Sequence, residues 1–159
     1  MTRLILATSL CLTLLFGGVA NAGTRQQSGP CDGRASDLKP SYGTVIIDRR
    51  VRQLEHCIEN RWPVPGGFAK LDYIIERESG RFPWAKNPDE SGACHFANPY
   101  GSCGLAQHLQ RYWLGRVHTF LPRSFFPGRW PYVSSLNARA NLIVTVRYVR
   151  ANGWGAWGG

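Results

Sequence analysis

Glu78 is the acidic residue of this chain whose position is best suited to chemistry. On a helix, at about 100° per residue, it shares one arc of about 120° with four apolar side chains, namely Phe68, Leu71, Ile74 and Ile75. A carboxylic acid on an apolar face loses hydration when it is charged, and it therefore tends to keep its proton. Cleavage of a glycosidic bond needs such a proton donor near neutral pH. The pattern therefore predicts a general acid at Glu78.

The position of Glu78 also has a purely structural explanation. Glu78 lies at the end of the predicted helix, where its side chain can turn to water or pair with Arg77 or Arg81. A negative charge at the C-terminal end of a helix is mildly unfavourable with the helix dipole. Position alone leaves both explanations open.

Four helices are predicted to position this residue. The first covers residues 44–60, where apolar residues recur at steps of four and three. The second covers residues 68–79 and stops at Gly80, a residue typical of helix ends. The third is expected at residues 105–117 and the fourth at 135–152, with an irregular segment rich in proline and aromatic residues between them. No strand of useful length is predicted, so the fold class is mainly α.

The N-terminal residues 1–22 have the pattern of a signal peptide. An apolar run at 4–16 follows a basic start, and Ala20-Asn21-Ala22 matches a signal-peptidase site. The run is shorter than the roughly 20 residues that a membrane span needs, and no later segment is more apolar. We therefore expect a secreted or wall-associated protein without a membrane span, with a flexible arm at residues 23–42 and one domain at 43–159.

Four cysteines remain after cleavage of the predicted signal peptide: Cys31, Cys57, Cys94 and Cys103. An even number in an exported chain indicates disulfides, and four cysteines allow three pairings. Cys94 and Cys103 bracket a loop of Gly, Pro and Asn within the long loop 81–103. We expect them to close it, which leaves Cys31 with Cys57. The cysteines lack metal-site spacing and the histidines do not cluster, so neither a metal nor a cofactor is expected.

The chain is strongly basic, with 19 Lys and Arg against 10 Asp and Glu. Cleavage after Ala22 would remove only Arg3, so the net charge would fall from +9 to +8. A basic surface favours polyanions such as anionic wall polymers, acidic glycans or nucleic acid. Export makes nucleic acid the least expected of these partners.

Several short motifs together resemble one enzyme family. Their residues are Glu78-Ser79-Gly80, Phe82-Pro83, Ala85-Lys86-Asn87, Gly104-Leu105-Ala106-Gln107, Asn137 to Tyr148, and Gly153-Trp154 with Trp157. In this order they resemble the catalytic Glu-Ser segment, the Gly-Leu-x-Gln motif, the final helix and the Gly-Trp-x-x-Trp ending of the soluble lytic transglycosylase branch of the lysozyme superfamily. The similarity covers residues 68–157.

The resemblance implies a single lysozyme-like domain with a long disulfide-tied loop. It also implies a monomeric, peptidoglycan-cleaving enzyme that acts on the bond between N-acetylmuramic acid and N-acetylglucosamine, with Glu78 as catalytic acid and base. The implied substrate-binding residues are Ser79, Gly104, Leu105, Gln107, Asn141 and Tyr148. Tyr148 shares a helix face with Asn141 and is the candidate for a family tyrosine that hydrogen-bonds the catalytic Glu. Trp154 and Trp157 are expected to pack against the domain.

The cleavage could follow either of two routes. A lytic transglycosylase needs only Glu78, because the 6-hydroxyl of the sugar closes an anhydro ring. A lysozyme-type hydrolase needs a second carboxylate, and Asp89 or the adjacent Glu90 would supply it from the loop. We favour the transglycosylase, because Asp89 and Glu90 also fit a solvated turn.

Two other function classes remain open. A non-catalytic wall-binding module would keep the aromatic and basic residues but would not need Glu78. A cationic antimicrobial protein would need an exposed amphipathic basic helix, for which residues 135–152 are the candidate.

Overall fold

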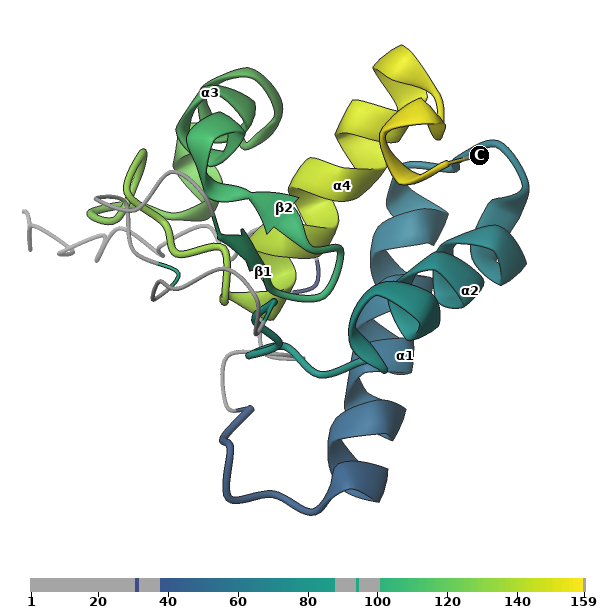
Figure 1. Cartoon of the computed structure of the whole chain (residues 1–159). Helices are drawn as coiled ribbons and strands as arrows, with labels where there is room; N and C mark the ends of the chain where they lie inside the picture. The colour runs from purple at the N-terminus through teal and green to yellow at the C-terminus, as the bar shows by residue number, and fades with distance from the viewer. Residues whose placement is uncertain (1–30, 32–37, 88–93, 95–100, 159) are drawn as a thin grey trace, which may run out of the picture.

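The computed structural model describes residues 31, 38–87, 94 and 101–158, and the fold within them is mainly helical. In chain order the elements are α1 (Thr44–Arg61), α2 (Gly67–Ser79), β1 (Ser102–Cys103), β2 (His108–Leu109), α3 (Gln110–Phe120), a 3-10 turn (Arg123–Phe125), α4 (Ala138–Asn152) and a final 3-10 turn (Gly155–Trp157) (Figure 1). The predicted mainly α class is confirmed. The predicted signal peptide lies outside the described residues. No helix among the described residues is long and apolar enough to cross a membrane.

The first two helices form where the periodicity predicts them. The buried stripe of α1 contains the predicted Ile47, Val51, Leu54 and Ile58. Helix α2 ends at Gly80, whose φ of 58° is left-handed and whose N–H donates to the carbonyl of Glu76. Glycine adopts this conformation without steric cost. The predicted end of the helix at Gly80 is therefore confirmed.

Helix α4 is the centre of the core. It packs against both α1 and α3, and ten of its fifteen residues are buried. A helix that is buried on nearly every side must be apolar around most of its circumference. It begins at Ala138, three residues later than predicted, because the side chain of Asn137 accepts a hydrogen bond from the N–H of Ala140 (2.9 Å) and caps the first turn.

The prediction of a helix that starts at Leu105 is wrong. Residues 102–109 form a short antiparallel hairpin in which Ser102 pairs with Leu109 and Cys103 with His108. The turn between the strands holds Gly104 at φ 77° and Gln107 at φ 48°. Left-handed residues cannot continue a right-handed helix, so α3 begins only at Gln110.

Both predicted disulfides are present. Cys31 is bonded to Cys57 and attaches the N-terminal segment to α1, while Cys94 is bonded to Cys103 at the end of β1. Disulfides persist in oxidising compartments. They therefore fit an extracellular protein.

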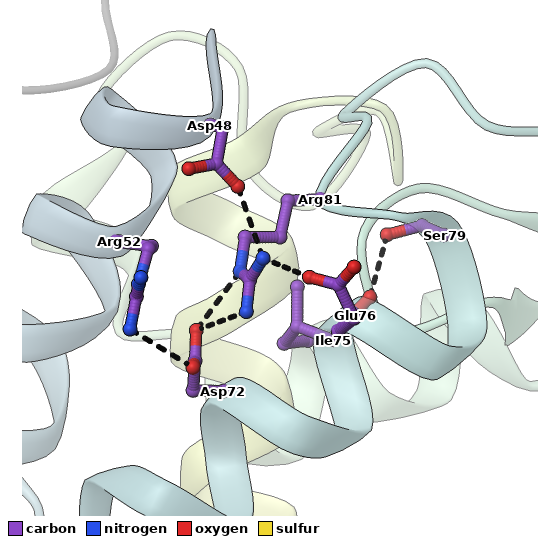
Figure 2. Close-up of polar contacts among 7 residues, drawn as sticks. All are labelled: Asp48, Arg52, Asp72, Ile75, Glu76, Ser79 and Arg81. Atoms are coloured by element: carbon purple, nitrogen blue, oxygen red, sulfur yellow. Dashed lines mark hydrogen bonds and ion pairs between the residues drawn. The ribbon is translucent and has the colours of Figure 1, made fainter. Parts of the chain in front are cut away.

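A cluster of charged side chains joins the N-terminal half of α1 to α2 and to the segment that follows it (Figure 2). Arg81 lies just beyond α2 and pairs with Asp72 (2.7 Å), Asp48 (3.0 Å) and Glu76. Arg52 of α1 also pairs with Asp72, at 3.2 Å. Arg81 therefore fixes the C-terminal end of α2 against α1 and is paired with these acids rather than with Glu78.

Candidate functional site

Glu78 lines a pocket of about 450 Å³ at the C-terminal end of α2. Three separate segments form it: the end of α2, the loop that follows, and the hairpin. The lining residues are Glu78, Ser79, Ala85, Lys86, Asn87, Ser102 and Gln107. Of the predicted site residues, the pocket brings Glu78, Ser79 and Gln107 together.

The carboxylate of Glu78 is paired with the neighbouring Arg77. Its Oε1 accepts hydrogen bonds from Nη2 (2.6 Å) and Nε (3.1 Å) of that arginine, and the Glu78 side chain is 24% exposed. These hydrogen bonds raise the pKa of the Arg77 guanidinium above its ordinary value. The ion pair with Arg77, which was the structural explanation for the position of Glu78, is therefore formed, and Glu78 also lines the pocket.

Ser79 is the other residue that α2 contributes to the pocket. Its hydroxyl donates to the carbonyl of Ile75 (3.0 Å) inside the helix (Figure 2). This bond uses the hydroxyl proton and leaves the lone pairs of the oxygen as the group that can meet a ligand.

The side chain of Gln107 is held in place by hydrogen bonds in the turn of the hairpin. Its Nε2 donates to the carbonyl of Gly104 (2.8 Å) and to that of Ala85 (3.3 Å). Its Oε1 accepts no hydrogen bond from a described residue. A left-handed non-glycine residue costs free energy and marks candidate functional positions. The carboxamide oxygen of Gln107 is thus a fixed acceptor at the edge of the Glu78 pocket.

Gly104 serves the packing of the hairpin. A Cβ added there would lie 2.2 Å from the carbonyl oxygen of Ser135 and 2.5 Å from Nδ2 of Asn141. A side chain is excluded at Gly104 because the segment that leads into α4 fills the space. Gly104, implied above as a substrate-binding residue, does not line the Glu78 pocket.

Asn141 and Leu105 are fully buried and do not line the pocket. The Oδ1 of Asn141 accepts from the N–H of Ala106 (3.0 Å), and its Nδ2 donates to the carbonyls of Ser135 (2.9 Å) and Cys103 (3.3 Å). Two of these hydrogen bonds hold the hairpin, and the third holds the segment that leads into α4. Asn141 therefore positions Gln107 rather than contacting a ligand in this arrangement.

Tyr148 lies in a second pocket, away from Glu78. Its ring is 4.5 Å from the Arg116 guanidinium and 5.7 Å from the ring centroid of Trp157. That pocket lies between α3 and α4 and shares no lining residue with the first. The structure therefore does not bring Tyr148 to Glu78.

The packing predicted for the two C-terminal tryptophans is present. Trp154 donates to the carbonyl of Pro65 (2.7 Å) and Trp157 to that of Ala106 (2.8 Å), and both rings are buried. The carbonyl of Trp157 also accepts from Arg77 (2.5 Å). Trp157 thus connects the end of α2 to the hairpin turn.

One buried carboxyl group was not predicted. Glu55 in α1 is fully buried, and neither of its side-chain oxygens has a hydrogen-bond partner among the described residues. Burial, followed by repulsion from the carboxylate of Asp72, raises the pKa of Glu55 to about 8. Its spacing of four from Val51 and three from Ile58 was the available signal, because it places Glu55 on the apolar stripe.

No second carboxylate lines the Glu78 pocket within the described part of the chain. Asp89 and Glu90 lie outside the described residues, so the role expected for Asp89 stays a prediction. No cluster of His, Cys, Asp or Glu suited to a metal ion occurs among the residues that the structure describes.

Comparison with known proteins adds no relative. The chain matches no protein-family model, and it has no significant match among curated proteins or among solved structures.

Proposed function

We propose that this chain is a secreted, lysozyme-like enzyme that cleaves the glycan strands of peptidoglycan, with Glu78 as acid and base. The observation that carries the proposal is that Glu78 and Gln107 line one pocket although 29 positions separate them in the chain. The motifs that resemble lytic transglycosylases imply a proton donor and an amide at these two positions. Peptidoglycan glycan strands would be the substrate, and anionic wall polymers would be additional partners.

The pocket offers complementary groups for a glycosidic bond. Glu78 would donate its proton to the glycosidic oxygen, and the fixed Oε1 of Gln107 would accept a hydrogen bond from a sugar hydroxyl or an N-acetyl N–H. The ammonium group of Lys86 is a further donor for sugar oxygens. All three groups converge on one pocket, as orientation of a bound sugar requires.

The ion pair with Arg77 sets a condition on this chemistry. An acid catalyst must hold a proton, whereas the guanidinium of Arg77 directs two N–H donors at one carboxylate oxygen of Glu78, an arrangement that suits the charged carboxylate. Arg77 is 40% exposed, so its side chain has room to leave. We therefore propose that substrate binding displaces Arg77 from Glu78 before protonation.

Mass spectrometry of the soluble products of purified peptidoglycan tests the proposal. Products about 18 Da lighter than ordinary muropeptides carry anhydro ends and identify a transglycosylase, whereas ordinary reducing ends identify a hydrolase. Glu78→Gln should release nothing, and Glu59→Gln, which changes a partly exposed carboxylate of α1, should behave like the parent. Equal product release by Glu78→Gln would refute Glu78 as the catalytic acid.

A second candidate function is glycan binding without cleavage. The closed Arg77–Glu78 ion pair favours it, because a permanently paired carboxylate is a poor proton donor. Sedimentation of the parent and of Glu78→Gln with insoluble peptidoglycan, with no soluble products from either protein, would support this function.

A further inference from the structure

The chain separates its charges into two halves. All ten acidic residues lie within residues 1–90, whereas residues 91–159 contain seven arginines and no Asp or Glu. Three of the described acids of α1 and α2, Asp48, Asp72 and Glu76, pair with Arg81 (Figure 2). The half that contains α3 and α4 is therefore positively charged with no acidic residue of its own to offset it.

A second pocket of about 470 Å³ opens in this basic half, between α3 and α4. Its lining residues are Arg111, Tyr112, Gly115, Arg116, Thr119, Phe120 and Tyr148. None of them is acidic. The pocket thus combines two guanidinium groups with three aromatic rings.

Arg116 is held in place before any ligand arrives. Its guanidinium lies over Tyr148 (4.5 Å to the ring centroid) and Tyr112 (5.7 Å), and its Nη1 donates to Nδ1 of His108 (2.6 Å). Burial lowers the pKa of His108 to about 3, so the ring is neutral and accepts this bond. The opposite ring nitrogen then donates to the hydroxyl of Thr145 (2.8 Å).

Arg116 has no carboxylate partner among the described residues. Its guanidinium donates to His108 and also interacts with the side chain of Tyr148. A guanidinium has five N–H donors in a planar fork that matches a carboxylate or a phosphate. Arg116 is therefore arranged to receive an anion.

The rings beside the two arginines indicate what the anion is attached to. Tyr112 is 48% exposed, and the guanidinium of Arg111 lies 4.7 Å from its ring centroid. An exposed aromatic ring offers its face to the C–H groups of a sugar. A free inorganic anion would need the guanidinium groups but not the exposed ring.

We propose that the pocket of Arg111, Tyr112, Arg116 and Tyr148 binds an acidic sugar of a negatively charged glycan. Its carboxylate or phosphate is bound by the two guanidinium groups, and the sugar ring lies against Tyr112. The site is separate from the Glu78 pocket, and the inference does not rest on the proposed cleavage.

Calorimetric titration of the full chain tests the site with four probes. A tetragalacturonate supplies carboxylates, a four-unit sugar-phosphate oligomer supplies phosphates, chitotetraose is the neutral glycan, and a thymidine tetranucleotide supplies phosphates on a nucleic acid. We expect at least one of the acidic glycans to bind more tightly than chitotetraose and than the tetranucleotide. The comparison of the first two probes identifies the anionic group.

Variants of exposed residues locate the binding. Arg111→Gln removes one charge-assisted contact and should weaken binding of the preferred glycan about tenfold, and Tyr112→Leu should weaken it by a similar factor. Arg129→Gln removes the same charge from an exposed position outside the pocket and should leave the affinity within about twofold of the parent.

Three outcomes would overturn the proposal. Unchanged affinity in both Arg111→Gln and Tyr112→Leu would exclude the pocket. An equal loss in Arg129→Gln would show attraction by net charge alone. Tighter binding of the tetranucleotide than of either acidic glycan would assign the basic half to nucleic acid. Because the two pockets share no lining residue, failure of the cleavage proposal leaves this test intact.

Discussion

Replacing Glu55 by Gln should change how the stability of the protein depends on pH. Folding raises the pKa of Glu55 from 4.5 to about 8, through burial and the nearby Asp72 carboxylate. The unfolded chain therefore loses this proton near pH 4.5, whereas the folded chain keeps it until about pH 8. Since the unfolded state binds fewer protons in this window, the free energy of unfolding falls as the pH rises.

The magnitude follows from the width of the window. Each pH unit within it costs about 1.4 kcal/mol, so the parent should lose about 3 kcal/mol of stability between pH 4.5 and pH 7 through Glu55 alone. Glu55→Gln has a similar shape but no proton to lose. Its buried amide adds a cost that is independent of pH, so the informative quantity is how the stability difference between the two proteins changes with pH.

Urea unfolding at several values between pH 5 and pH 8, with the disulfides intact, measures that change. The free energy of unfolding of Glu55→Gln should rise relative to that of the parent by about 1.4 kcal/mol for each pH unit. For Glu59→Gln, one helical turn further along α1, the difference from the parent should be the same at every pH. Parallel curves for Glu55→Gln and the parent would refute the reasoning. They would mean that Glu55 is solvated or paired in the folded protein.

Three further substitutions test the supports of the site, each by urea unfolding against the parent. Gly104→Ala places a Cβ against the carbonyl of Ser135 in a left-handed residue and should cost more than about 2 kcal/mol, so a cost below 1 kcal/mol would contradict the described turn. Trp157→Phe removes the indole N–H that bonds Ala106 and should cost about 1–3 kcal/mol while reducing activity on peptidoglycan, whereas unchanged stability would exclude a role for that bond. Asn137→Ala removes the cap of α4 and should cost about 1 kcal/mol, a loss that Asn137→Ser should largely restore.

Features set by local sequence were predictable. The stripe of α1 and the stop at Gly80 depend on residues within one or two helical turns, and both were predicted correctly. The pairing of Cys94 with Cys103 depends on a short loop. Such features need no knowledge of distant partners, because the helical repeat and the conformational freedom of glycine act locally.

The hairpin and the positions of three site residues were not predictable in this way. The turn at Gly104 requires contact with Asn141, 37 positions later, and periodicity contains no information about that contact. A glycine followed by apolar residues is equally compatible with the start of a helix. Asn141 and Tyr148 share a helix face, yet one binds the hairpin and the other lines the second pocket. A shared helix face shows that two residues are neighbours on the helix, but it does not show which other segments their side chains contact.

The contacts of Trp157 explain how Glu78 and Gln107 come to line one pocket. The Nη2 of Arg77 donates both to Oε1 of Glu78 and to the carbonyl of Trp157, and the indole of Trp157 bonds Ala106, the residue before Gln107. Two hydrogen bonds through the C-terminal segment therefore join the two sides of the pocket. A movement of Arg77 that frees Glu78 must also break or bend the bond to Trp157. In the proposed reaction, the release of the acid and the position of Gln107 are consequently coupled through one tryptophan.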